Sequence, residues 1–298
     1  MHVVVFGATG LLGGKVVNEL LDQGDSVTAV VRDFERAKPL ANKGVALLKG
    51  DLKDIDSLHN AFQNMEKPID GLVTTAYGYS RSKPGDTLKS VDDQGNKNLV
   101  AAAKAANVGR FVFTSILTAD KAVNVPHFYQ KSKTEEVIEC SGLDWVSLRP
   151  GGFLDTLLTL NEKSIRKGKL MMPADLEART SVILSDDVAK YLAKAFHLPD
   201  ISGERIDLGI YPTTNLIELA EALSEVLGHQ VKASSPPKFL TSMMFRVMGL
   251  FSPFMQDNIK AMEYVSSGQY VADLKRQTEL FGEPPTLQDS LQRWAAKQ

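Results

Sequence analysis

The sequence contains very little cysteine and no cluster of histidines. Cys140 is the single cysteine among 298 residues, so no disulfide can form within the chain, and this use of cysteine fits a reducing compartment. The five histidines are scattered, and none of their spacings matches those of a zinc site. We therefore expect neither an internal disulfide nor a structural metal.

Long apolar runs and an excess of basic residues are also missing. No stretch reaches the roughly 18 uninterrupted apolar residues that a membrane-spanning helix needs. The start, MHVVVFGATG, lacks the charged segment followed by an apolar segment that marks a secretory leader. The formal net charge is -2, so no basic field points to nucleic acid or to an anionic membrane. These features predict a cytoplasmic protein that binds neither nucleic acid nor membrane.

What the sequence does contain is a regular alternation of short apolar runs and amphipathic segments. The runs are rich in β-branched residues and fit buried strands, whereas the intervening segments carry apolar residues at helical spacing. Strict alternation predicts right-handed crossovers and an α/β fold with a doubly wound parallel sheet. The expected strands are 2–6, 26–31, 45–50, 71–77, 110–116 and 144–150, and the expected helices between them are 14–23, 36–42, 55–65, 91–106 and 129–140.

The alternation loosens after Pro150. Helices are expected at 185–196, at 216–227 and near the C-terminus, with one more strand at 204–209. We therefore predict a Rossmann-type dinucleotide-binding domain over residues 1–155. Residues 156–298 are predicted to form a smaller, mostly helical substrate lobe that is partly integrated with the first domain.

A glycine motif, GATGLLG, follows the first expected strand and opens the first expected helix. Its glycines, Gly7, Gly10 and Gly13, would permit a tight turn and would let backbone N–H groups approach a pyrophosphate at the positive end of the helix. A bare glycine pattern is weak evidence, but this one lies between the right strand and the right helix. It predicts a dinucleotide cofactor.

The end of the second expected strand bears on which dinucleotide binds. A site for NAD usually ends this strand with an acidic residue that accepts the ribose 2′-hydroxyl. Here the strand ends in VVRD, and Arg32 can form charge-assisted hydrogen bonds to a 2′-phosphate. Asp33 is the counter-evidence, because it falls near the usual position of the ribose-binding acid. On balance the sequence favours NADP over NAD.

Several motifs together resemble the short-chain dehydrogenase/reductase superfamily of the extended or atypical kind, in its NmrA-like group. They are GATGLLG, VVRD, GD at 50–51, TTA at 74–76, FVFTSI, YQKSK and SGLDWVSLRPGGF. The resemblance implies that Asp51 and Leu52 flank the adenine and that Pro150 and Phe153 close over the nicotinamide. The full set of cofactor contacts that it implies is Gly7, Thr9, Gly10, Leu11, Leu12, Gly13, Arg32, Asp51, Leu52, Thr75, Ala76, Lys133, Pro150 and Phe153.

The same resemblance implies a catalytic serine, tyrosine and lysine, which match Ser115, Tyr129 and Lys133. A lysine ammonium beside a phenol lowers the pKa of the phenol, which can then act as general acid to a carbonyl that receives hydride. Ser115 would position that oxygen, and Lys133 would also hold the nicotinamide ribose. Lys131 is an alternative ammonium, and Thr114 or Thr118 could replace the serine. His127 is a further candidate proton donor.

The segment KFLTSMMFRVMGLFSPFM, residues 238–255, is interpreted either as core packing or as an apolar lid over the nicotinamide. We predict an NADPH-dependent oxidoreductase that transfers hydride to a small, mostly apolar carbonyl or quinone. Two alternatives stay open. One is a non-catalytic NADP(H) sensor that binds a protein partner, and the other is a nucleotide-sugar epimerase or dehydratase.

Overall fold

The computed structural model describes residues 1–78, 85–236 and 253–297. The chain divides into two compact units. The first contains residues 1–116, 130–149 and 185–206, and the second contains residues 117–129, 150–184 and 207–298. The units do not meet at a single boundary near residue 155, because the chain returns to the first unit at residue 185.

The first unit is built on a seven-stranded sheet with the order β10-β6-β5-β4-β1-β2-β3. The pairings from β3 through β6 are parallel. This order confirms the predicted doubly wound sheet, in which the chain reverses direction across the sheet between β1 and β4. The strands are β1 (His2–Phe6), β2 (Ser26–Val31), β3 (Ala46–Lys49), β4 (Gly71–Thr74), β5 (Arg110–Thr114), β6 (Asp144–Pro150) and β10 (Glu204–Leu208).

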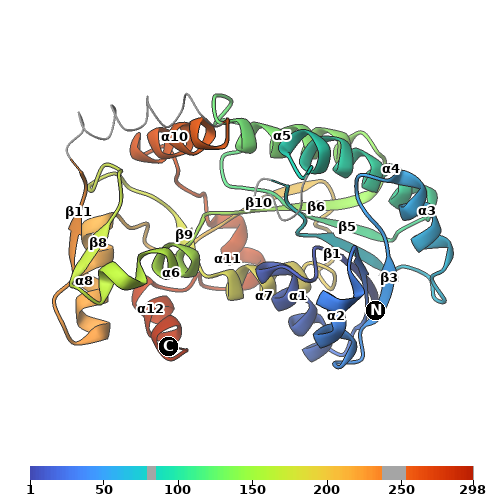
Figure 1. Ribbon diagram of the computed structural model, residues 1–298, viewed down its shortest axis with the longest axis horizontal. Coiled ribbons are helices and arrows are strands. Elements are labelled where there is room, and N and C mark those ends of the chain that lie inside the picture. Colours follow the sequence, from blue (N-terminus) through green and yellow to red (C-terminus); the bar gives the residue numbers. More distant parts are fainter. Residues whose placement is uncertain (79–84, 237–252, 298) are drawn as a thin grey trace. The chain divides into compact units, whose positions relative to one another are not determined.

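Helices cover both faces of this sheet. Figure 1 shows α3, α4 and α5 along one face and α1, α2 and α7 along the other. Every residue of β1 is buried, as expected for a strand covered on both sides. The helices are α1 (Leu11–Asp22), α2 (Phe34–Ala41), α3 (Ile55–Gln63), α4 (Asn96–Ala105), α5 (Pro126–Glu139) and α7 (Ser185–Lys194).

A π-helix, η1 (Leu88–Gly95), precedes α4 without a break. Thr87 caps its start, since the Thr87 hydroxyl accepts from the Ser90 backbone N–H and the Thr87 backbone N–H donates to the Ser90 hydroxyl. The wide turn places Asp92 in the interior, where its carboxylate accepts a hydrogen bond from the Gly78 backbone N–H. The sequence predicted an ordinary helix over this segment, because a π-turn leaves no separate pattern of apolar residues.

The second unit has a separate apolar core. Leu154, Leu219, Leu223, Leu291 and Trp294 are among its buried members. Its elements are β7 (Gly152–Phe153), α6 (Leu154–Ile165), β8 (Lys169–Met171), β9 (Val182–Ile183), α8 (Leu216–Leu227), β11 (Lys232–Ser234), α10 (Pro253–Ser266), α11 (Lys275–Phe281) and α12 (Leu287–Ala295). The two-strand pairs β7–β9 and β8–β11 are too short to leave a sequence pattern.

Three predictions from composition meet the structure here. Most of the proposed lid, residues 238–252, lies outside the described residues. In the described ranges no helix is long and apolar enough to cross a membrane. The same part of the chain shows no group of three or more histidine, cysteine or acidic side chains that could hold a metal. The cytoplasmic location stays a prediction.

Candidate coenzyme and active site

The glycine motif forms a tight loop between β1 and α1. Gly7 has a φ of +82°, and a Cβ on Gly7 would lie 2.6 Å from the Thr75 hydroxyl. A Cβ on Gly13 would lie 2.2 Å from the Gly7 carbonyl oxygen, so α1 can approach the strands this closely only because residue 13 is glycine. Thr75 fixes the other side of the loop, since its backbone N–H donates to the Phe6 carbonyl at 3.0 Å.

The start of α1 is available to an anion. Gly10 is its N-cap and supplies no side-chain acceptor for the first N–H groups of the helix. Leu11 is 61% exposed, although it is a large apolar residue. Exposed backbone donors and an exposed leucine fit a loop built to receive a pyrophosphate. Gly7, Thr9, Gly10, Leu11, Leu12 and Gly13 all lie on this loop or on the first turns of α1.

The end of β2 carries a cation rather than a free acid. The Asp33 carboxylate caps α2 by accepting from the backbone N–H groups of Glu35 and Arg36. Arg32 extends to Asp86, whose two carboxylate oxygens both lie 2.9 Å from its Nη1 atom. The helix cap occupies the acid that would suit NAD, so the counter-evidence from Asp33 loses its weight.

Asp51 and Leu52 follow β3 and are held by local bonds. The Asp51 carboxylate accepts from the Lys53 backbone N–H at 3.0 Å. Leu52 is 7% exposed, and its carbonyl accepts from the Asn98 side chain at 2.9 Å. Both lie beyond the carboxyl ends of the strands, where an open α/β sheet binds its ligand.

A fully buried lysine lies at the carboxyl end of β5. The Lys131 ammonium donates to the Thr114 carbonyl at 3.0 Å and lies 4.8 Å and 5.5 Å from the ring centres of Phe113 and Tyr77. Burial lowers the pKa of Lys131, and the negative charges of Asp92 and Glu135 oppose that shift. Within the described ranges, no carboxylate lies within ion-pairing distance of this ammonium.

The residues of the predicted catalytic set have different surroundings. Ser115 follows β5, is 5% exposed, and donates its backbone N–H to the Leu148 carbonyl. Tyr129 is 39% exposed. Lys133 lies on the outer side of α5, where its ammonium pairs with Glu136 at 2.8 Å. The structure therefore places Lys131, which was the alternative, at the strand ends and turns Lys133 towards solvent.

Another buried charge lies one turn further along α5. The Glu135 carboxylate accepts from Arg149 and from Arg205, and also from the Ser147 hydroxyl at 2.7 Å. Burial acts to raise the pKa of Glu135, but the Arg149 guanidinium and the serine hydroxyls lower it overall. Arg205 also stacks 4.9 Å from the centre of the Trp145 ring. The cluster joins α5 to β6 and β10.

In the second unit, Pro150 and Phe153 lie at the turn from β6 into α6. The Pro150 carbonyl accepts from the Leu117 backbone N–H at 2.9 Å, and Phe153 is the N-cap residue of α6. His127 pairs through Nδ1 with the buried Asp257 at 2.9 Å. A buried histidine held in this way has a structural role at the start of α5.

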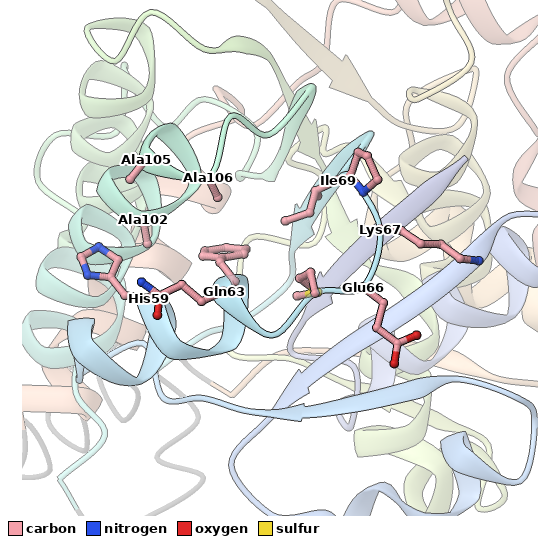
Figure 2. A pocket seen from close by; sticks show the side chains of 11 residues that line it. His59, Gln63, Glu66, Lys67, Ile69, Ala102, Ala105 and Ala106 are labelled. Carbon is pink, nitrogen blue, oxygen red and sulfur yellow. The ribbon is translucent and has the colours of Figure 1, made fainter.

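A hollow on the first unit lies away from these residues. Figure 2 shows His59 and Gln63 of α3, Ala102, Ala105 and Ala106 of α4, and Lys67 and Ile69 just before β4 around it. Residues that precede β4 mark the amino ends of the strands, whereas ligands of such sheets bind at the carboxyl ends. None of the predicted site residues lines this hollow.

The family follows from a comparison of the whole chain with known families. The NmrA-like family model matches residues 1–274. The chain belongs to the NmrA-like family. Membership confirms the resemblance that the glycine motif and the later motifs suggested. It also confirms the Rossmann-like NAD(P)-binding fold of the family for this chain.

Named relatives of this NmrA-like chain include proteins with different roles. It is 28% identical over 308 residues to photosystem II assembly factor Ycf39 of Synechocystis sp., covering 99% of this chain and 90% of that protein. It is 25% identical over 289 residues to quinone oxidoreductase 2 of Escherichia coli, covering 95% of each. Triphenylmethane reductase of Citrobacter sp., solved in complex with NADP(H), has a TM-score of 0.80 at 21% identity, covering 99% of this chain and 100% of that one.

Proposed function

We propose that this protein is an NADPH-dependent oxidoreductase that transfers hydride to a small, mostly apolar carbonyl or quinone. The observation that carries the proposal is the buried Lys131 ammonium at the carboxyl end of β5. A lysine is rarely buried without a paired carboxylate unless a ligand uses its charge. The names of two relatives, a quinone oxidoreductase and a dye reductase crystallised with NADP(H), support the reaction class.

The residues of the first unit fit the coenzyme. The loop of Gly7 and Gly10 and the uncapped start of α1 would bind the pyrophosphate. Arg32 and Lys53 would bind the 2′-phosphate of NADP(H), since both are cations near the ends of β2 and β3. When bound, the nicotinamide supplies the hydride.

The chain's own groups then handle charge and proton. Lys131 would hold positive charge next to the reacting centre, in a dry site where that charge is strong. The buried Thr114 hydroxyl, which forms no hydrogen bond among the described residues, offers a donor at the same strand end. Tyr129 stays the proposed general acid and Ser115 the proposed orienting hydroxyl. Lys133 stays a predicted ligand of the ribose, although its exposed pair with Glu136 favours Lys131 for that role.

The test is NADPH oxidation by a short-chain benzoquinone, measured for the wild type and for Tyr129→Phe. Loss of the phenolic proton is expected to lower kcat by about 100-fold or more, while the affinity for NADPH stays unchanged. Tyr211→Phe is the matched control, because Tyr211 is 64% exposed and lies outside the proposed site. Equal kcat in the wild type and Tyr129→Phe would remove Tyr129 from the mechanism.

The similarity to an assembly factor supports a second candidate, a protein that binds the coenzyme and a protein partner without turnover. The same experiment separates the two. If the wild type binds NADPH but no quinone or carbonyl is reduced above the rate of free NADPH, the binding role is favoured and the oxidoreductase is abandoned.

A further inference from the structure

Two cations from different loops converge on the carboxylate of Asp86. The Arg32 Nη1 atom lies 2.9 Å from both carboxylate oxygens, and the Lys53 ammonium lies 2.9 Å from Oδ1. The Asp86 side chain is 2% exposed, whereas the side chains of Arg32 and Lys53 are each 28% exposed. The cations are therefore accessible from solvent while the anion that they bind is not.

The position of these cations matches the ribose end of a dinucleotide. Arg32 directly follows β2, and Lys53 lies just beyond the neighbouring strand β3. In doubly wound sheets the group on the adenosine 2′-carbon lies at the end of the second strand. A phosphate there requires convergent, charge-assisted N–H donors, and Arg32 and Lys53 supply them.

We propose that the Asp86 carboxylate is an internal competitor for the 2′-phosphate of NADP(H), and that it thereby sets the preference of this protein between NADP(H) and NAD(H). The inference rests on the proposed function, because it assumes that a dinucleotide binds at the glycine loop. Without ligand, Asp86 neutralises Arg32 and Lys53. With a 2′-phosphate, the same cations are taken by the phosphate.

Competition is favoured over joint binding for an electrostatic reason. A buried carboxylate beside a phosphate that carries up to two negative charges would repel it strongly at short range. The hydrogen bonds from Lys53 and Arg32 keep the pKa of Asp86 low in spite of its burial, so protonation does not relieve the repulsion near neutral pH. Asp86 must withdraw, and that step weakens the binding of the phosphate.

The experiment is a calorimetric titration of the full-length protein with adenosine 2′,5′-bisphosphate, with 5′-AMP, and with NADPH. Asp86→Asn keeps the size of the side chain and removes its charge. The expected result is that its Kd for adenosine 2′,5′-bisphosphate falls on the order of tenfold, while its Kd for 5′-AMP stays the same. Asp56→Asn is the charge-matched control, because Asp56 is exposed on α3 and should change neither Kd.

Each outcome has a distinct meaning. If both proteins bind NADPH but Asp86→Asn gains nothing for the bisphosphate, this inference fails and the proposed function stands. If neither protein binds NADPH, both fail. If Asp86→Asn instead loses affinity for NADH, Asp86 is an acceptor for the ribose hydroxyl, which also overturns the inference.

A crystal structure of the wild type with adenosine 2′,5′-bisphosphate tests the same point without a variant that could fold poorly. The expected structure has the phosphate on Arg32 and Lys53 and the Asp86 carboxylate released from Arg32. A bound phosphate with the Asp86–Arg32 hydrogen bonds intact would contradict the competition.

Discussion

Lys131 and Glu135 lie one turn apart on the buried side of α5, and their surroundings differ in kind. Glu135 is 1% exposed and Lys131 8% exposed. The carboxylate receives two guanidinium groups and a hydroxyl, whereas the ammonium has one carbonyl acceptor and two aromatic ring faces. One buried charge is neutralised by its neighbours and the other is not.

The difference separates a structural charge from a functional one. A buried ion pair that is fully bonded holds elements together, and removing one partner leaves the other charge uncompensated. A buried ammonium with a lowered pKa costs stability in the unliganded protein, and such groups cluster at functional sites. We therefore expect substitutions at Glu135 to change stability and substitutions at Lys131 to change activity.

The largest expected effect tests the structural half of this comparison. Glu135→Ala should lower the free energy of unfolding by about 3–5 kcal/mol, because it leaves Arg149 and Arg205 without their shared anion in the interior. Urea unfolding followed by circular dichroism measures it. Glu136→Ala, one residue away on the exposed side, should change stability by no more than about 0.5 kcal/mol. Similar values for the two variants would break the comparison.

The functional half predicts a smaller but still large effect on turnover. Lys131→Met keeps much of the volume of the side chain and removes its charge. We expect kcat/KM with NADPH and a quinone to fall by about 100-fold, with the midpoint of urea unfolding unchanged or raised. Lys133→Met is the matched control on the same helix, and it should keep most of the activity. The reverse order of the two variants would restore Lys133 as the predicted catalytic lysine.

The smallest effect is a pH dependence, and it sharpens the comparison. Burial lowers the pKa of Lys131 from its ordinary 10.5. Activity that requires the ammonium should therefore decline as the pH rises through the lowered pKa, before an ordinary lysine would titrate. Below that pKa the folded protein bears the full cost of the buried charge. This cost decreases as the pH rises towards 10.5, so the wild type should gain stability relative to Lys131→Met over that interval. Parallel stability curves for the two proteins would contradict a buried, titrating Lys131.

The sequence allowed much of the first unit to be predicted, because its signals are local. The β-branched run before Gly7 and the glycines themselves determine a strand, a tight turn and a helix within a few residues. The short strands β7 and β8 leave no such pattern, since two or three residues cannot establish an alternation. The return of residues 185–206 to the first unit depends on contacts distant in sequence, such as those of Lys15 with Ser185 and Asp186.

The choice between the two lysines shows where sequence reasoning reached its limit. The Tyr-x-x-x-Lys spacing favoured Lys133, because residues four apart share a face of a helix. Phe128, Lys131, Glu135 and Ile138 are the buried positions, and they also follow helical spacing. Two of these four are charged, so a search for apolar residues does not find the buried side. The aromatic and aliphatic residues at 128 and 138, taken as one stripe, would have indicated that Lys131 lies between them.

The π-helix η1 has a consequence for the length of the chain. It contains a wide turn just before α4, and α4 places Leu99 and Ala103 in the core. Deleting a single residue from 88–95 would allow ordinary α-helical hydrogen bonding, but it would rotate the inward residues of one side relative to the other by about 100°. Gly95, where a Cβ would lie 3.0 Å from the Leu52 side chain, would lose its place against the β3–α3 loop. Insertions and deletions in this segment are therefore tolerable only in combinations that restore the phase of α4.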